Sequence, residues 1–218
     1  MASGGPFDRL HDRREGGLLL AGRLAAYAGD ANAIVLALPR GGVPVGFEIA
    51  RALGIPLDVF IVRKLGVPGH AELAMGALAS GGTFLLNDDV IHKLRIPREE
   101  VEAALERERL EIERRERLYR GDRPRPELAG KTVILVDDGL ATGASMGAAI
   151  AALRRMNPAR IVAAVPVAAA TIRIHLGPQA DELICLQTPE PFYSVGQWYE
   201  NFDQTSDAEV RRLLKADG

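Results

Sequence analysis

The fold is decided by the stretch Val133-Ile-Leu-Val-Asp-Asp-Gly-Leu-Ala-Thr-Gly-Ala-Ser145. Its four apolar residues predict a short buried strand, and Asp137 and Asp138 mark the carboxyl end of that strand. The small residues that follow lead into an apolar pattern with helical spacing. A strand, a tight loop and a helix in this order are typical of an α/β protein that binds its ligand at the strand ends.

The same alternation of strands and helices extends in both directions from this stretch. Short apolar runs that end at turn signals predict parallel strands at Ile34–Leu38, Leu57–Val62, Val133–Val136 and Ile161–Val165, with a weaker one at Glu182–Leu186. Helices are predicted at Val43–Leu53, which closes at Gly54, and at Ser145–Met156, which closes at Asn157-Pro158. We therefore expect an α/β fold, a Rossmann-like, mostly parallel sheet flanked by helices.

Two regions interrupt the alternation. Gly66–Asn87 is rich in glycine and small residues, with a hairpin as one alternative around Gly81-Gly82, and such a stretch is typical of a mobile lid. Pro97–Arg120 predicts a highly charged helix in which opposite charges compensate one another. A solvated helix is favoured there over a partner-binding one. No linker divides the chain, so residues 1–218 are expected to form a single domain with a core at about 30–167.

Composition limits the possible functions. The chain has 218 residues, 47% hydrophobic and 26% charged, which is ordinary for a globular protein. A formal net charge of −2 predicts no general attraction to nucleic acid or to anionic membranes. One cysteine, Cys185, allows no internal disulfide, and no apolar run reaches membrane-spanning length. We expect a cytoplasmic protein without nucleic-acid or membrane partners.

The loop after Asp138 has the chemistry of a phosphate site. The small residues from Ala141 to Ala144 let backbone N–H groups approach an anion, and the start of a helix adds its positive dipole end. Thr142 and Ser145 add hydroxyl donors. The adjacent carboxylates of Asp137 and Asp138 suit a vicinal diol or a hydrated Mg²⁺ rather than the phosphate. Together these groups predict a ribose 5-phosphate.

Two further segments carry groups suited to anions. Pro39-Arg-Gly-Gly42 follows the first predicted strand and opens a helix, which forms a second site for an anion. Arg63 and Lys64 follow the second predicted strand and suit a departing diphosphate, although they also fit a pair of surface cations. Neither loop has the spacing of a P-loop or of the dinucleotide fingerprint.

Asp137-Asp-Gly-Leu-Ala-Thr-Gly-Ala-Ser145 resembles the signature with which type I phosphoribosyltransferases bind phosphoribosyl pyrophosphate (PRPP). Pro39-Arg-Gly-Gly42 resembles the family's pyrophosphate loop in its xanthine-type form, whereas the first motif is more similar to that of the adenine enzymes. The mixture suggests a branch with features of both. One departure is Gly139, where the family usually has an aliphatic residue.

The resemblance implies a role for each matching residue. Asp137 and Asp138 would hold the ribose hydroxyls and, through water, Mg²⁺. The 5′-phosphate would be bound by Ala141, Thr142, Gly143, Ala144 and Ser145, and the pyrophosphate by Arg40, Gly41, Gly42, Arg63 and Lys64. The resemblance also implies a homodimer and a reaction that moves ribose 5-phosphate to a nitrogen of a base.

Two segments match the family only by position. Residues 66–87 take the place of its flexible catalytic loop, in which His70 and Glu72 are candidate catalytic residues; an exposed loop residue without a role is the alternative for both. Lys64, just before this loop, is a third catalytic candidate. Residues 180–205, with N-terminal residues as a further component, take the place of the small hood that binds the base. Its candidates are Phe192, Tyr193 and Trp198, and the alternative is an aromatic cluster that packs the tail onto the sheet.

The base that would accept the ribose 5-phosphate is the least defined part of the predicted reaction. Ala141 stands where the 6-oxopurine enzymes carry an aspartate as general base, which counts against hypoxanthine or guanine handled in the usual way. A purine is favoured. Two alternatives stay open: a PRPP-sensing regulator without turnover, and an enzyme of another phosphosugar, such as a kinase or an isomerase.

Overall fold

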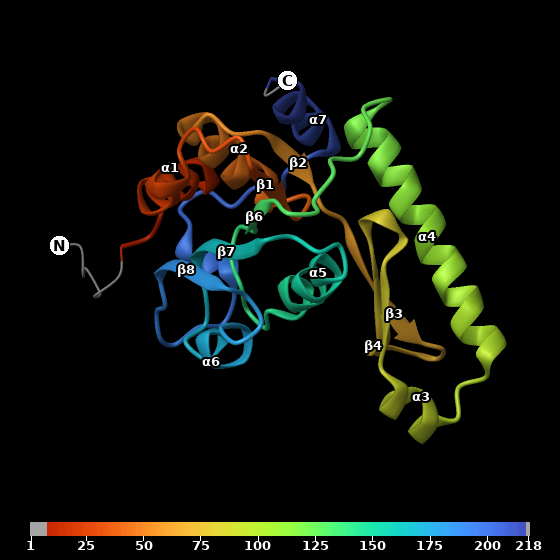
Figure 1. The fold of residues 1–218 in the computed structure, drawn as a ribbon. Helices are drawn as coiled ribbons and strands as arrows, with labels where there is room; N and C mark the ends of the chain where they lie inside the picture. Colours follow the sequence, from red (N-terminus) through yellow and green to blue (C-terminus); the bar gives the residue numbers. More distant parts are fainter. Residues whose placement is uncertain (1–7, 217–218) are drawn as a thin grey trace.

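A five-stranded parallel sheet lies between two layers of helices (Figure 1). The computed structural model describes residues 8–216, except for the side chains at positions 71, 72, 173 and 175. The strand order is β2-β1-β6-β7-β8, and neighbouring strands pair in parallel. The strands are β1 Ala33–Ala37, β2 Leu57–Val59, β6 Thr132–Val136, β7 Arg160–Val167 and β8 Glu182–Gln187. The predicted α/β fold is confirmed.

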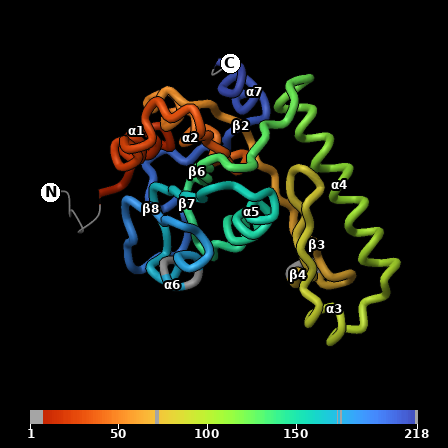
Figure 2. The backbone as a smooth tube through the Cα atoms, viewed as in Figure 1, coloured from red at the N-terminus to blue at the C-terminus, as the bar shows by residue number. Residues whose placement is uncertain are grey.

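Helices cover both faces of this sheet. On one face pack α1 (Arg13–Arg23), α2 (Gly42–Leu53) and α7 (Asp207–Ala216), and on the other α5 (Ala144–Arg154) and α6 (Ile172–Leu176). Val35 of β1 points to the first face and Leu36 to the second. Because both faces are buried, the strands are apolar throughout instead of alternating. In Figure 2 the C-terminal helix α7 lies against α2.

The first helix, α1, was not predicted, because its residues Gly16 and Gly17 are poor helix formers. Their position explains them. A Cβ atom on Gly17 would lie 2.6 Å from the backbone oxygen of Val45 in α2, and one on Gly16 would lie 2.8 Å from Cγ of Pro166 in β7. The glycines thus allow α1 to pack directly on α2 and on the sheet.

A second, antiparallel sheet replaces the Gly-rich loop expected at residues 66–87. Its strands are β3 Val62–Val67, β4 His70–Ala79 and β5 Phe84–Leu86, and the short 3₁₀ helix η2 (Ser80–Gly82) joins the last two. The hairpin expected around Gly81-Gly82 is therefore confirmed, whereas the single strand Leu57–Val62 was wrong. The chain leaves the first sheet after Val59. At the base of the second sheet the Ser80 N–H donates to the backbone oxygen of Ile61, and the Ile61 N–H donates to the Ser80 hydroxyl.

The long charged helix α4 (Arg98–Arg120) lies along this second sheet, after the short helix α3 (Asp88–Leu94). Its apolar side chains pack inward, with Val101, Ala104 and Ile112 buried in the same core as Leu65 of β3. The outer face carries ion pairs such as Arg109–Glu106, at 2.6 Å. The expected solvated helix is thus correct for one face only. Within residues 8–216, no helix combines the length and apolar character needed to cross a bilayer.

Candidate active site

The two predicted anion-binding loops meet, because β1 and β6 are neighbours whose carboxyl ends lie at the same edge of the sheet. A Cβ atom on Gly42 would lie 2.7 Å from the backbone oxygen of Val136. One on Gly41 would lie only 2.0 Å from Oδ2 of Asp138. A side chain at either position would displace the end of β6 or the carboxylate. Glycine is therefore required at both positions for the loops to touch.

The loop expected to bind a phosphate is open to solvent. Ala141, Thr142, Ala144 and Ser145 are exposed. Buried Gly143 has φ of 71°, in the left-handed region that favours glycine, and it directly precedes the first residue of α5. The N–H groups in the first turn of a helix have no partner within that helix, and here they face this loop. An exposed helix start behind a tight glycine turn suits an anion.

The carboxylates of Asp137 and Asp138 are half-buried at the end of β6. Burial raises the pKa of Asp137 well above its ordinary value, and the neighbouring negative charge of Asp138 raises it further. Burial also raises the pKa of Asp138, and the positive charge of Arg13 opposes that rise. The pair is therefore stabilised by any cation or hydroxyl donor that approaches it.

Arg13 of α1 binds the second of these carboxylates. Its Nε atom lies 2.8 Å from Oδ2 of Asp138, and its Nη1 atom donates to the backbone oxygen of Asp203 at 2.7 Å. The guanidinium carbon lies 3.8 Å from the centre of the Phe202 ring. Sequence reasoning missed this residue, since Arg13 stands among other charged N-terminal residues and belongs to no motif.

Arg40 is also held by a side chain from the far end of the chain. Its Nη1 atom lies 3.6 Å from the Asp207 carboxylate at the start of α7. The hydroxyl of Tyr119 in α4 donates to the same carboxylate at 2.6 Å. The predicted pyrophosphate-binding arginine thus lies next to the joint between α4 and α7, which the sequence did not indicate.

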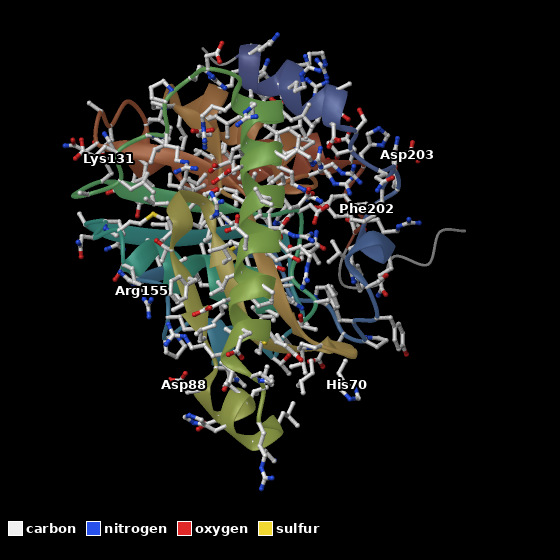
Figure 3. All side chains as sticks on the ribbon, turned by 90° about the vertical axis from the view of Figure 1, so that its right-hand side faces the viewer. His70, Asp88, Lys131, Arg155, Phe202 and Asp203 are labelled. Carbon is white, nitrogen blue, oxygen red and sulfur yellow. The ribbon has the colours of Figure 1, made fainter. Side chains whose placement is uncertain are left out.

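The second sheet carries the candidate catalytic residues. Arg63 points toward α4, where it pairs with Glu108 at 2.8 Å, and alternation along β3 therefore turns exposed Lys64 to the opposite side. His70 is exposed at the tip of the β3–β4 hairpin. In Figure 3 it lies on the same side of the molecule as Phe202, with Lys131 on the opposite side. The side chain of Glu72 lies outside the described residues.

Comparison with known proteins identifies the family of the chain. Residues 14–187 match the family described as the phosphoribosyl transferase domain. The chain belongs to the type I phosphoribosyltransferase family. A Mycobacterium tuberculosis protein, named provisionally as a phosphoribosyl transferase, is 46% identical over 203 residues, which are 93% of this chain. Those residues are 46% of that protein, so the chain spans about half the length of the curated relatives it matches.

Solved structures support the same fold. The Thermus thermophilus protein TT1426 is 41% identical, with a TM-score of 0.84 over 96% of this chain and 99% of its own. A Neisseria gonorrhoeae protein solved with bound ppGpp has a TM-score of 0.52 at 14% identity, over 98% of both chains, and shares the fold alone.

Residues 188–205, the part of the predicted hood that lies beyond the matched residues, contact Asp138 at the end of β6. The Tyr199 hydroxyl donates to the backbone oxygen of Asp138 at 2.5 Å. Phe192 and Trp198 stack on each other with ring centres 6.5 Å apart, in a cluster with Leu10. This arrangement favours the packing alternative for both. Tyr193, the third base-binding candidate, is 82% exposed.

The departure at Gly139 also has a structural reason in the hood. A Cβ atom on Gly139 would lie 2.5 Å from Cγ1 of Val195 and 3.0 Å from Cγ1 of Val167. The hood residue Val195 therefore occupies the space that a side chain at position 139 would fill. This contact could not be predicted from the sequence, since Val195 lies 56 positions after Gly139 in the chain.

Proposed function

We propose that this chain transfers the ribose 5-phosphate of PRPP to a nitrogen of a base, with release of pyrophosphate. The observation that carries the proposal is the contact between the two anion-binding loops at the Gly41 and Asp138 pair. It brings the Arg40–Gly42 loop next to the two carboxylates, which directly precede the loop from Ala141 to Ser145, and this order supports sites for a diphosphate, a diol and a phosphate. PRPP has a diphosphate, a vicinal diol and a phosphate monoester in the same order.

The proposed contacts follow this order. Asp137 and Asp138 accept hydrogen bonds from the ribose hydroxyls, and the loop from Ala141 to Ser145 binds the 5′-phosphate. Arg40, Gly41 and Gly42 bind the diphosphate, with Lys64 approaching from the second sheet. Arg63 was predicted beside Lys64, but its ion pair with Glu108 does not favour that role.

In the proposed reaction, a base nitrogen forms a bond to carbon 1 of the sugar as the bond from carbon 1 to the diphosphate oxygen breaks. The electron pair leaves with the pyrophosphate, and positive charge develops on the sugar. Arg40 and Lys64 stabilise the negative charge of the leaving group, while the two loops fix the position of the sugar. His70 and Glu72 remain the candidates for moving a proton to or from the base.

Mg²⁺ fits the chemistry of this donor set. Among the described residues, no group of three or more His, Cys, Asp and Glu side chains could hold a metal ion without other ligands. Asp137 and Asp138 supply oxygen donors, and Mg²⁺ characteristically combines one or two carboxylates with water and substrate phosphates. When bound with PRPP, the metal ion would neutralise part of the diphosphate charge.

Pyrophosphate-driven cleavage of a panel of nucleoside monophosphates tests the proposal and identifies the base. We expect release of one base class, favoured to be a purine, and loss of activity in Asp137→Asn/Asp138→Asn. Tight binding of PRPP without cleavage of any nucleotide would instead favour a PRPP sensor. Failure to bind PRPP with Mg²⁺ in calorimetry would contradict both. A homodimer, a cytoplasmic location and a role in nucleotide salvage also stay predictions.

A further inference from the structure

We propose that Arg13 is a positioning residue that holds the Asp138 carboxylate in the orientation that accepts a ribose hydroxyl. The inference rests on the proposed function, because it concerns the same sugar site. Arg13 lies one residue before the segment that matches the family, and it acts on the ligand only through Asp138.

Three contacts fix the guanidinium of Arg13. One edge binds Oδ2 of Asp138 at 2.8 Å, and Nη1 binds the backbone oxygen of Asp203 at 2.7 Å. The face of the guanidinium lies over the Phe202 ring, 3.8 Å from its centre. The side chain is only 11% exposed. A guanidinium held at two edges and one face has few alternative positions, so it can define the position of its partner.

Asp138 is correspondingly fixed on several sides. Its Oδ2 atom lies between Arg13 and the Cα of Gly41, where even a methyl group would not fit. Its backbone oxygen accepts the Tyr199 hydroxyl at 2.5 Å. The contacts with Arg13 and Gly41 occupy Oδ2, so the proposal assigns the ribose hydroxyl to Oδ1. Without Arg13, the carboxylate is free to rotate about its side-chain bonds and to lose part of its orientation.

Charge gives a second reason for an arginine at this place. Asp137 and Asp138 are adjacent and half-buried, so their negative charges repel each other strongly. A cation on the far side of Asp138 offsets this repulsion without occupying the space of the sugar. The neighbouring Arg14, in contrast, pairs with Glu48 of α2 at 2.9 Å and provides a matched control on the same helix.

The test compares two ligands, ribose 5-phosphate and methyl phosphate, by calorimetry. Both carry a phosphate monoester, but only the first has sugar hydroxyls. In Arg13→Met we expect the affinity for ribose 5-phosphate to fall by about tenfold, the scale of a hydrogen bond to a charged group, with no change for methyl phosphate. A residue with a purely structural role would weaken both ligands equally. Arg14→Met should leave both affinities unchanged.

Further variants decide the remaining outcomes. Arg13→Met/Asp138→Asn should bind ribose 5-phosphate no more weakly than Asp138→Asn alone, since Arg13 acts through that carboxylate. Arg13→Lys keeps the charge but loses the planar fork, so its preference for ribose 5-phosphate should be intermediate. If Arg13→Met does not fold, as judged by circular dichroism, the decision rests on Arg13→Lys, and wild-type preference there would overturn the inference.

The experiment also separates this inference from the proposed function. A wild-type protein that shows no preference for ribose 5-phosphate over methyl phosphate contradicts the proposed role of the carboxylates, and with it the proposed function. A wild-type preference that persists in folded Arg13→Met contradicts only the role of Arg13.

Discussion

The Arg40 guanidinium lies 3.6 Å from the carboxylate of Asp207, although 167 positions separate the two residues in the chain. Tyr119 donates its hydroxyl to the same carboxylate at 2.6 Å, so α4 fixes the position of Asp207. The helix α7 thereby orients an arginine of the proposed pyrophosphate loop. The family match ends at residue 187, well before this helix.

Asp207→Asn should lower kcat/KM for PRPP by a fewfold, with a loss in kcat as well as a rise in KM, because Arg40 binds the diphosphate and stabilises its charge as it leaves. Steady-state kinetics with the base identified by the nucleotide panel would measure both constants. The matched control is Glu209→Gln on the same helix, whose carboxylate lies 3.9 Å from Arg212. Equal changes in the two variants would contradict the role of Asp207.

Gly41→Ala should reduce the affinity for PRPP by more than about tenfold while the protein stays folded. The new methyl group would lie 2.0 Å from Oδ2 of Asp138 in the present geometry, so either the loop or the carboxylate must move. Calorimetry with PRPP and Mg²⁺ gives the affinity. In Gly22→Ala the methyl group would meet no atom within 4 Å, so that variant should bind normally. Normal binding by Gly41→Ala would mean that the contact between the loops is not needed.

An exchange of side chains between Gly139 and Val195 tests whether positions 139 and 195 share one space between the hood and the proposed sugar site. Gly139→Val should lower activity, because its Cβ would lie 2.5 Å from Cγ1 of Val195. Val195→Gly removes this contact, the shortest one, and leaves those with Val167 at 3.0 Å, so Gly139→Val/Val195→Gly should recover part of the lost activity. The comparison needs the KM for the base as well as for PRPP, and we expect the larger changes in the former. A double variant no better than Gly139→Val would argue against a shared space.

A buried ionic network at the end of α4 should make stability depend on pH. Burial by itself raises the pKa of Glu116, but hydrogen bonds from Arg125 and Ser80 outweigh it and hold the pKa below its ordinary value. The charged carboxylate therefore stabilises the folded state. This stabilisation is fully present above the unfolded pKa of about 4.3 and is lost as the pH falls through the lower pKa of the folded state. The network should therefore weaken in acid.

Glu116→Gln should lower the free energy of unfolding at pH 7 by about 1 to 2 kcal/mol, since Arg125 loses its charged partner while Arg120 keeps its ion pair with Asp58. The difference from the wild type should shrink as the pH falls from about 4.3, the unfolded pKa, and through the lower folded pKa of Glu116, because the wild-type carboxylate then becomes neutral as well. Urea unfolding over a series of pH values from 7 downward measures it. Glu113→Gln, on the exposed face of the same helix, should change stability by less than about 0.5 kcal/mol. A Glu116→Gln effect independent of pH would contradict the ionic origin.

Several elements were predictable because their signals are local. The strands β1, β6 and β7 are continuous apolar runs, and the positions of Gly54 and Asn157 near the helix ends follow from their left-handed backbone. Beyond the hairpin at Gly81-Gly82, the strands of the second sheet were not predicted, since Gly66, Ala74 and Gly76 have low strand propensity. They form strands because neighbouring Leu65 and Met75 are buried in the core that includes α4. Burial of these side chains in the core stabilises strands that local propensity alone does not favour.

The sequence by itself determined the α/β class, the family and the two loops at the strand ends, because each depends on residues that are adjacent in the chain. Only the tertiary structure decided what surrounds those loops. Arg13 meets Asp138 and Asp207 meets Arg40 because the two ends of the chain pack over the carboxyl edge of the sheet. Contacts between residues so far apart depend on how helices and sheet pack together, and no local pattern records them.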